Sequence, residues 1–125
     1  MANITTVKYG GSVPGADAND YELFSTVTAN LHPNFFPMNR VAKFQIFVKN
    51  PQAGVLKEYE SEDGGTNWSQ VSNTAVAAAA ATAQNAYEFV VEPYRDWKLV
   101  WTNGGVAQTG WVVKMAMLED RGAAG

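Results

Sequence analysis

The sequence contains no cysteine and a single histidine among its 125 residues. A chain without thiols has no disulfide framework and no thiolate metal site, and Cys/His nucleophilic chemistry is excluded. The one histidine, His32, lies in a loop bounded by prolines and has no Gly-x-Ser-x-Gly nucleophile elbow near it. The sequence therefore predicts no catalytic residue, no metal and no cofactor, and we expect a protein that is not an enzyme.

Charge and long apolar runs are also scarce. Charged residues make up 17% of the chain, and the net charge of -3 comes from acids and bases scattered along it, without a basic stripe that could neutralise phosphates. The N-terminal segment lacks the apolar run of a signal peptide, and no segment approaches the roughly 20 apolar residues that cross a bilayer. We expect a soluble protein that binds neither nucleic acid nor membrane and uses no classical export signal.

Three segments alternate apolar and polar residues with the period of two that is typical of half-buried strands, at 41–49, 94–103 and 109–118. A helix would scatter these apolar residues around its circumference, whereas a strand places them on one face. The rows that we expect to face the core are Ala42, Phe44, Ile46 and Val48; Trp97, Leu99 and Trp101; and Trp111, Val113, Met115 and Met117.

Weaker strand signals fill the rest of the chain, and glycine, proline and asparagine separate them. A length of 125 residues corresponds to one domain. Together these features predict an all-β fold, an antiparallel β-sandwich or jelly roll of seven to eight strands. We expect residues 1–20 to form an extended N-terminal arm and residues 21–125 a single β-sandwich domain. The weaker strands are expected at 4–9, 21–30, 55–61, 68–72 and 87–91, and the alanine-rich segment 74–85 as a short helix or an irregular loop.

The stretch SEDGGTNW, residues 61–68, has three interpretations. As an acid/base pair, Glu62 and Asp63 would have to converge on one substrate, yet neighbours on a strand point to opposite faces. As a calcium loop, the acids of segment 58–63 lack the spacing of the helix-loop-helix motif. We instead expect Glu58, Glu60 and Glu62 to lie on a solvated strand face.

A tight hairpin is the third interpretation, and it explains each residue of the stretch. Gly64 and Gly65 supply positive φ, Ser61 and Asp63 accept hydrogen bonds from turn amides, and Trp68 is expected to return its ring to the core. The pattern resembles the Asp-box hairpin of sialidase propellers, S-x-D-x-G-x-T-W, with asparagine in place of the threonine. That motif is structural in its family, so the resemblance implies a hairpin and not a glycosidase.

A second resemblance covers residues 41–119. The order is an alternating strand FQIFVKN, the SEDGGTNW turn, a late strand that ends in Thr-Asn-Gly-Gly, and a glutamine that opens the last strand. This order is similar to small β-sandwich domains of bacteriophage virion proteins, especially head decoration (cement) proteins and fibre domains. The resemblance implies a structural protein on the outer surface of the capsid, in a virion made in the host cytoplasm. Its implied partners are the major capsid protein and further copies of itself in a homotrimer.

Two surfaces are candidates for partner contact. In the loop HPNFFPMNR at 32–40, the residues Phe35, Phe36, Met38 and Arg40 suit an interface, although the loop could instead fold back as an internal plug.

Alternatively, Trp97, Trp101 and Trp111 could stack against sugar rings, as in a carbohydrate- or receptor-binding domain of a tail fibre. This reading requires the three rings to be exposed, because buried rings form no platform.

Overall fold

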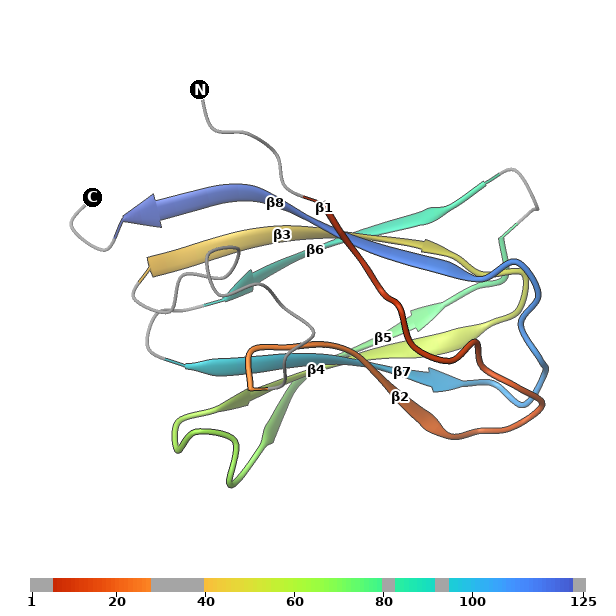
Figure 1. Ribbon diagram of the computed structural model, residues 1–125, viewed down its shortest axis with the longest axis horizontal. Coiled ribbons are helices and arrows are strands. Elements are labelled where there is room, and N and C mark those ends of the chain that lie inside the picture. Colours follow the sequence, from red (N-terminus) through yellow and green to blue (C-terminus); the bar gives the residue numbers. More distant parts are fainter. Residues whose placement is uncertain (1–5, 28–39, 80–82, 92–94, 123–125) are drawn as a thin grey trace.

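The computed structural model describes residues 6–27, 40–79, 83–91 and 95–122 (Figure 1). Within these ranges the chain forms eight β-strands and no helix, which confirms the all-β prediction and the expected strand number. In the same ranges there is accordingly no helix with the length and hydropathy that a membrane crossing needs. The strands are β1 Thr6–Lys8, β2 Asp20–Ser25, β3 Arg40–Lys49, β4 Gly54–Ser61, β5 Ser69–Val76, β6 Asn85–Val91, β7 Asp96–Asn103 and β8 Val112–Gly122.

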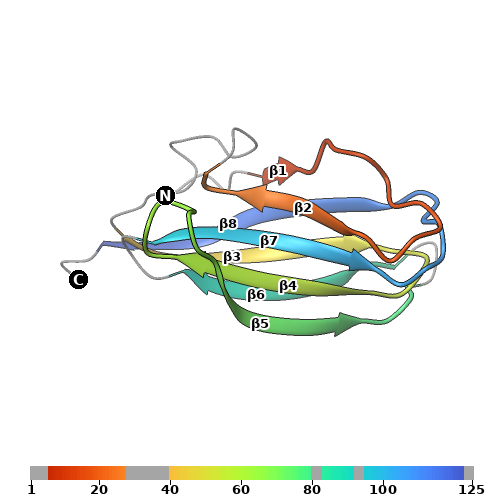
Figure 2. The same cartoon turned by 90° about the horizontal axis from the view of Figure 1, so that it is seen from below.

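The strands form two four-stranded antiparallel sheets with the orders β1-β8-β3-β6 and β2-β7-β4-β5. Figure 1 shows the two sheets as separate layers stacked face to face, and Figure 2 looks onto the sheet β2-β7-β4-β5 with the other sheet behind it. Strand β1 pairs with β8, β2 with β7, β3 with β6, and β4 with β5. The chain therefore doubles back on itself as one long hairpin that is rolled across both sheets. This is the topology of a jelly roll.

The core lies between the sheets and is built from the alternating rows of the sequence. Trp97, Leu99 and Trp101 are 0% exposed, as are Phe44 and Ile46. The rings of Phe44 and Trp97 stack with centroids 5.9 Å apart, so strands of opposite sheets interlock. The other predicted core residues whose side chains are described, Val48, Trp111, Val113 and Met115, are also buried.

The alanine-rich segment is not helical where the structure describes it. Strand β5 continues to Val76, and residues 77–79, 83 and 84 have no regular structure before β6 begins at Asn85. The reason is pairing with β4, which aligns Ala75 with Val55 and Thr74 with Leu56. These ladder hydrogen bonds replace a helix that would be too short to persist alone.

The described part of the expected N-terminal arm is bonded to the sandwich, and its first three residues form a strand. Strand β1 joins the edge of one sheet, and the amide of Tyr9 donates to the Val113 carbonyl at 2.9 Å. Further along, the Gln108 amide donates to the carbonyl of Pro14 at 2.9 Å. The connection then crosses to the other sheet, where β2 lies at the edge beside β7 (Figure 1).

Candidate functional site

The hairpin between β4 and β5 is built around the Ser61 hydroxyl. Ser61 is buried, and its Oγ accepts hydrogen bonds from the amides of Gly65 at 2.9 Å and Asp63 at 3.3 Å. The same hydroxyl donates to Oδ1 of Asp63 at 2.7 Å. Gly64 and Gly65 adopt φ of 73° and 92°, the left-handed conformation that glycine tolerates. One small side chain therefore organises the turn.

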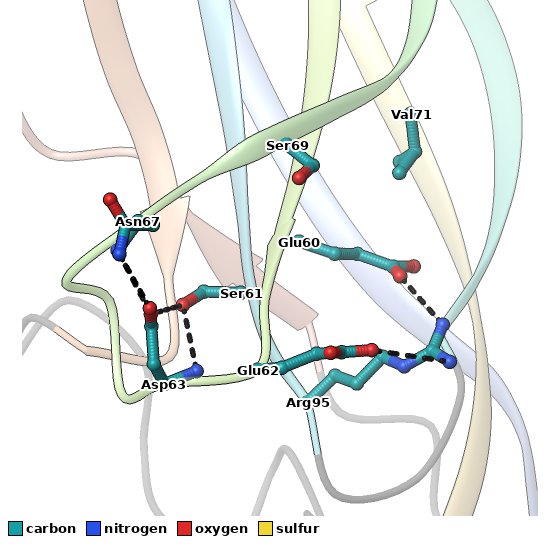
Figure 3. Close-up of a pocket in the computed structure, with 8 residues that line it drawn as sticks. All are labelled: Glu60, Ser61, Glu62, Asp63, Asn67, Ser69, Val71 and Arg95. Carbon is teal, nitrogen blue, oxygen red and sulfur yellow. Dashed lines mark hydrogen bonds and ion pairs between the residues drawn. The ribbon is translucent and has the colours of Figure 1, made fainter.

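Asp63 closes the other half of the turn. Its Oδ1 accepts from the Asn67 amide at 2.9 Å, and its Oδ2 accepts from Asn67 Nδ2 at 2.8 Å. These bonds from Asn67, together with the one from Ser61, lower the pKa of Asp63 from 3.8 to about 2. Asparagine at the position of the Asp-box threonine thus supplies two donors to the carboxylate. Asp63 serves as an anchor of the turn (Figure 3).

The prediction that Trp68 returns to the core is wrong. Its ring is half-buried and is not a member of the buried core cluster. The Lys98 ammonium lies 4.5 Å from the centroid of the Trp68 ring and 5.3 Å from that of Tyr59. The neighbouring Ser69 pairs in register with Glu60, and both line a pocket beside the hairpin, so Trp68 points to the opposite side. Trp68 therefore packs on the outer face of the sheet β2-β7-β4-β5.

A pocket of about 380 Å³ opens beside the hairpin, and Arg95 fills its acidic part. Arg95 Nη1 lies 3.0 Å from Glu60 Oε1, and Nη2 lies 3.9 Å from Glu62 Oε1 (Figure 3). The guanidinium therefore takes the place that a cation would need. Across the described ranges, no group of three or more His, Asp or Glu side chains could hold a metal ion. The pocket is lined by Glu60, Ser61, Glu62, Asp63, Asn67, Ser69, Val71 and Arg95.

The expected solvated face of Glu58, Glu60 and Glu62 also needs correction. Glu58 is only 7% exposed and points inward, where its Oε2 accepts from Trp97 Nε1 at 2.7 Å and its Oε1 from Ser72 Oγ at 3.0 Å. Burial raises the pKa of Glu58, and the bonds from Trp97 and Ser72 oppose that rise. Of the three acids, the Glu62 side chain alone is largely in solvent, with 82% exposure.

The tryptophan platform for sugars is excluded. Trp97 and Trp101 are 0% exposed and Trp111 is 5% exposed, so none of them offers a face to a ligand. Trp101 Nε1 donates to Asn103 Oδ1 at 3.2 Å. Trp111 Nε1 is buried and has no hydrogen-bond partner among the described residues. These three rings fill the core, which is their commoner use.

A buried amide network escaped the sequence analysis. Asn103 is 2% exposed, and its Nδ2 lies within hydrogen-bond distance of the carbonyls of Gly15, Asp17 and Val106. Gln108 is 4% exposed, and its Nε2 donates to Asn103 Oδ1 at 3.0 Å. The sequence signal was ambiguous, because asparagine beside two glycines is ordinary turn composition.

The loop proposed as an interface falls outside the part of the chain that the structure describes. This applies to Phe35, Phe36 and Met38, and also to His32. Arg40 begins β3, but its side chain is not described. The interface and plug interpretations of this loop both stay predictions.

Comparison with known proteins identifies a solved structure with a similar fold but does not assign the chain to a family. No protein-family model matches the chain, and no curated protein does. The crystal structure of the PBSX exported protein XepA is similar, with a TM-score of 0.66 and 15% identity over 90% of this chain. This chain spans 36% of the XepA chain. The structure of infectious bursal disease virus, Gx strain, also aligns, at 15% identity over 91% of this chain and 27% of the other. Its TM-score of 0.36 is too low to indicate a shared fold. The fold of this chain is thus shared with part of XepA.

Proposed function

We propose that the chain is a non-enzymatic structural protein of a phage virion, a decoration protein that binds the outer surface of the assembled head shell and stabilises it. The observation that carries the proposal is the jelly roll common to this chain and XepA, an exported protein of the phage PBSX. The order of turn motifs along residues 41–119, which resembles that of head decoration proteins, points the same way.

The use of the polar side chains supports a passive scaffold. Four polar side chains form hydrogen bonds within the fold: those of Glu58, Asp63, Asn103 and Gln108. Groups held in this way stiffen turns and loops, and a stiff scaffold keeps its contact surfaces in a fixed arrangement. On a shell that repeats the same binding site many times, a modest contact made by each copy becomes effective in sum.

The proposed partners are the major capsid protein and two further copies of this chain in a homotrimer, as the resemblance implies. Contact through Phe35, Phe36, Met38 and Arg40 would place two rings and a methionine at the boundary between shell subunits. Such residues are enriched at interface centres. Bridging a boundary in this way strengthens the shell, because separating its subunits would expose that apolar surface again.

The proposal is tested by mixing the purified protein with shells assembled without it and measuring the retained protein per shell subunit after sedimentation. We expect stoichiometric retention of the wild type. The double variant Phe35→Ser and Phe36→Ser should lose retention with an unchanged Tm. The control Val106→Ser, at an exposed valine in the loop between β7 and β8, should retain binding.

Two results would count against the proposal. Absent retention of the wild type, combined with binding on a glycan array, would overturn the decoration role in favour of a receptor-binding domain. A destabilised monomer in the phenylalanine variant would instead identify the loop as an internal plug and remove it from the interface.

A further inference from the structure

The outer face of the sheet β1-β8-β3-β6 carries four lysines, and three of them, Lys8, Lys49 and Lys114, form no ion pair with a described side chain. Lys8 pairs in register with Lys114, Lys114 with Phe47, and Phe47 with Ala86, so these residues form one row across all four strands. Val113 and Met115 on either side of Lys114 are 0% exposed, so the row points outward. We call this surface the lysine face; its described members are Lys8, Lys43, Gln45, Phe47, Lys49, Ala86, Glu88, Val90, Val112, Lys114 and Ala116.

The arrangement of its charges costs stability. Lys8 and Lys114 lie directly opposite each other, and like charges at such positions destabilise a sheet. Both side chains are exposed, and neither forms an ion pair with any residue that the structure describes. The one described carboxylate on the face is that of Glu88, which lies 3.6 Å from Lys43 Nζ. A partner that brings carboxylates to this face would relieve the repulsion.

The outer face of the second sheet lacks this imbalance. There Glu22 pairs in register with Val100, and Val100 with Lys57, so one row holds an acid and a base. The ammonium of Lys98 lies over the rings of Trp68 and Tyr59. Glu22 shares a row with Lys57, so this surface holds both acids and bases. The concentration of lysines is therefore specific to one face of a chain whose net charge is -3.

We propose that the lysine face docks on a carboxylate-rich surface of another protein, which under the proposed function is the outer surface of the shell subunit. This inference rests on the proposed function and names the chemistry of its partner. Half-buried Phe47 and Val90, which is 51% exposed, add apolar contact among the amines. That mixture of amines and apolar side chains suits a protein partner better than a nucleic acid. Surfaces that bind nucleic acids are more uniformly basic, and the negative net charge of this chain would repel the phosphates.

A recess at the end of the face adds shape to the charge. A cavity of about 380 Å³ lies beside Lys8 and is lined by Tyr9, Val13, Trp111 and Val112 as well as by two glycines. Val112 belongs to the lysine face, where it pairs in register with Lys49. The cavity is therefore continuous with the surface that we propose to dock. A side chain of the partner surface can enter it next to the Lys8 ammonium.

The test compares Lys114→Glu with Lys57→Glu, a control with the same charge change on the opposite sheet. Placing glutamate opposite Lys8 turns a repulsive pair into an attractive one, so we expect the Tm of Lys114→Glu to rise by about 1 to 4 °C. Its affinity for shells assembled without the protein should nevertheless fall roughly tenfold. Wild-type binding should weaken with added salt, and Lys57→Glu should bind like the wild type.

The possible results separate the two proposals. If wild type and Lys114→Glu bind shells with equal affinity, docking through the lysine face is wrong, whereas the decoration role is unaffected. Failure of the wild type to bind shells would overturn the decoration role, and the proposed docking partner with it. Loss of the homotrimer in Lys114→Glu would reassign the face to contact between copies. Wild-type binding to duplex DNA that Lys114→Glu abolishes would overturn the choice of a protein partner.

Discussion

Glu58 is a carboxylate held inside the sandwich by donors from both neighbouring strands. It faces Trp97 on β7 and Ser72 on β5, at 2.7 Å and 3.0 Å. A buried carboxylate without donors would cost several kcal/mol, of order 2–7 even for a neutral polar group. The hydrogen bonds offset much of that cost, but desolvation still dominates and the pKa of Glu58 is raised above 4.5. Glu58 therefore binds its proton more tightly in the folded protein than in the unfolded chain.

We expect this residue to make stability depend on pH. Because the folded pKa is the higher one, the stabilising contribution is complete below pH 4.5 and is lost as the pH rises through the folded pKa. Urea unfolding followed by tryptophan fluorescence between about pH 4 and 8 should show this decline in the wild type. Glu58→Gln should remove the decline, and parallel pH profiles would contradict the assignment.

Two neighbouring effects can be kept apart in that experiment. The pKa of Asp63, lowered from 3.8 to about 2, adds stability that is present above pH 3.8 and is lost as the pH falls through about 2, below the window of Glu58. Glu58→Ala serves as the control for hydrogen bonding. It removes the acceptor of the Trp97 N–H, so we expect a loss of about 1–3 kcal/mol below pH 4.5, where the contribution of Glu58 is complete.

At the scale of elements, the β4–β5 hairpin depends on two adjacent glycines that differ in their surroundings. Both have positive φ, at 73° for Gly64 and 92° for Gly65. A Cβ on Gly64 would meet no atom within 4 Å, whereas on Gly65 it would lie 3.0 Å from Val27 and 3.3 Å from Trp68. Gly65 thus lets the turn close against Trp68 and against Val27, which follows β2.

The two positions should separate in a mutational test. Gly64→Ala introduces left-handed strain alone, and we expect it to lower the free energy of unfolding by about 1–2 kcal/mol. Gly65→Ala adds crowding and should cost roughly 1 kcal/mol more. Chemical denaturation of both variants measures the difference, with Gly10→Ala, where a Cβ meets nothing within 4 Å, as the control. An equal loss of unfolding free energy in the two variants would show that the Val27 and Trp68 side chains move aside from the added Cβ without cost.

At the scale of the whole molecule, one buried network joins three connections at the end of the sandwich opposite the hairpin (Figure 1). Asn103 at the end of β7 reaches the β1–β2 connection through Gly15, with Nδ2 2.8 Å from the carbonyl. Gln108 holds the β3–β4 turn by accepting from the Gln52 amide at 3.0 Å and donating to its carbonyl at 2.9 Å. Both sheets are thereby tied together where three loops meet.

Removing the centre of this network should destabilise the whole fold. Asn103→Ala leaves several buried groups unsatisfied, and we expect a loss of roughly 2–4 kcal/mol in the free energy of unfolding. Hydrogen exchange should show lost protection at the Gly105 and Gln108 amides, which donate to the carbonyls of Asp17 and Pro14. Asn73→Ala, on the exposed side of β5, should stay within about 0.5 kcal/mol of the wild type. A similar loss in both variants would refute the special role of the network.

Some features of the site could be predicted from local sequence, and others could not. The hairpin bonds of Ser61 and Asp63 span at most four residues, so their pattern is visible in the sequence itself. The two donors to Glu58 lie farther away, 14 residues along the chain for Ser72 and 39 for Trp97. When no donor is visible nearby in the sequence, a carboxylate is not expected on the core face, because its desolvation would cost too much. The burial of Glu58 was therefore missed.

The sequence by itself determined the strongly alternating strands β3, β7 and β8, their described inward rows, and the turn between β4 and β5. Side chains on a strand alternate regardless of which strand lies beside it, and glycine acts within its own turn. The tertiary structure alone decided the order of strands in each sheet, the row that places Lys8 beside Lys114, and the meeting of Asn103 with Gly15. These features join residues from distant parts of the chain, and packing of the two sheets, which no local pattern encodes, brings them together.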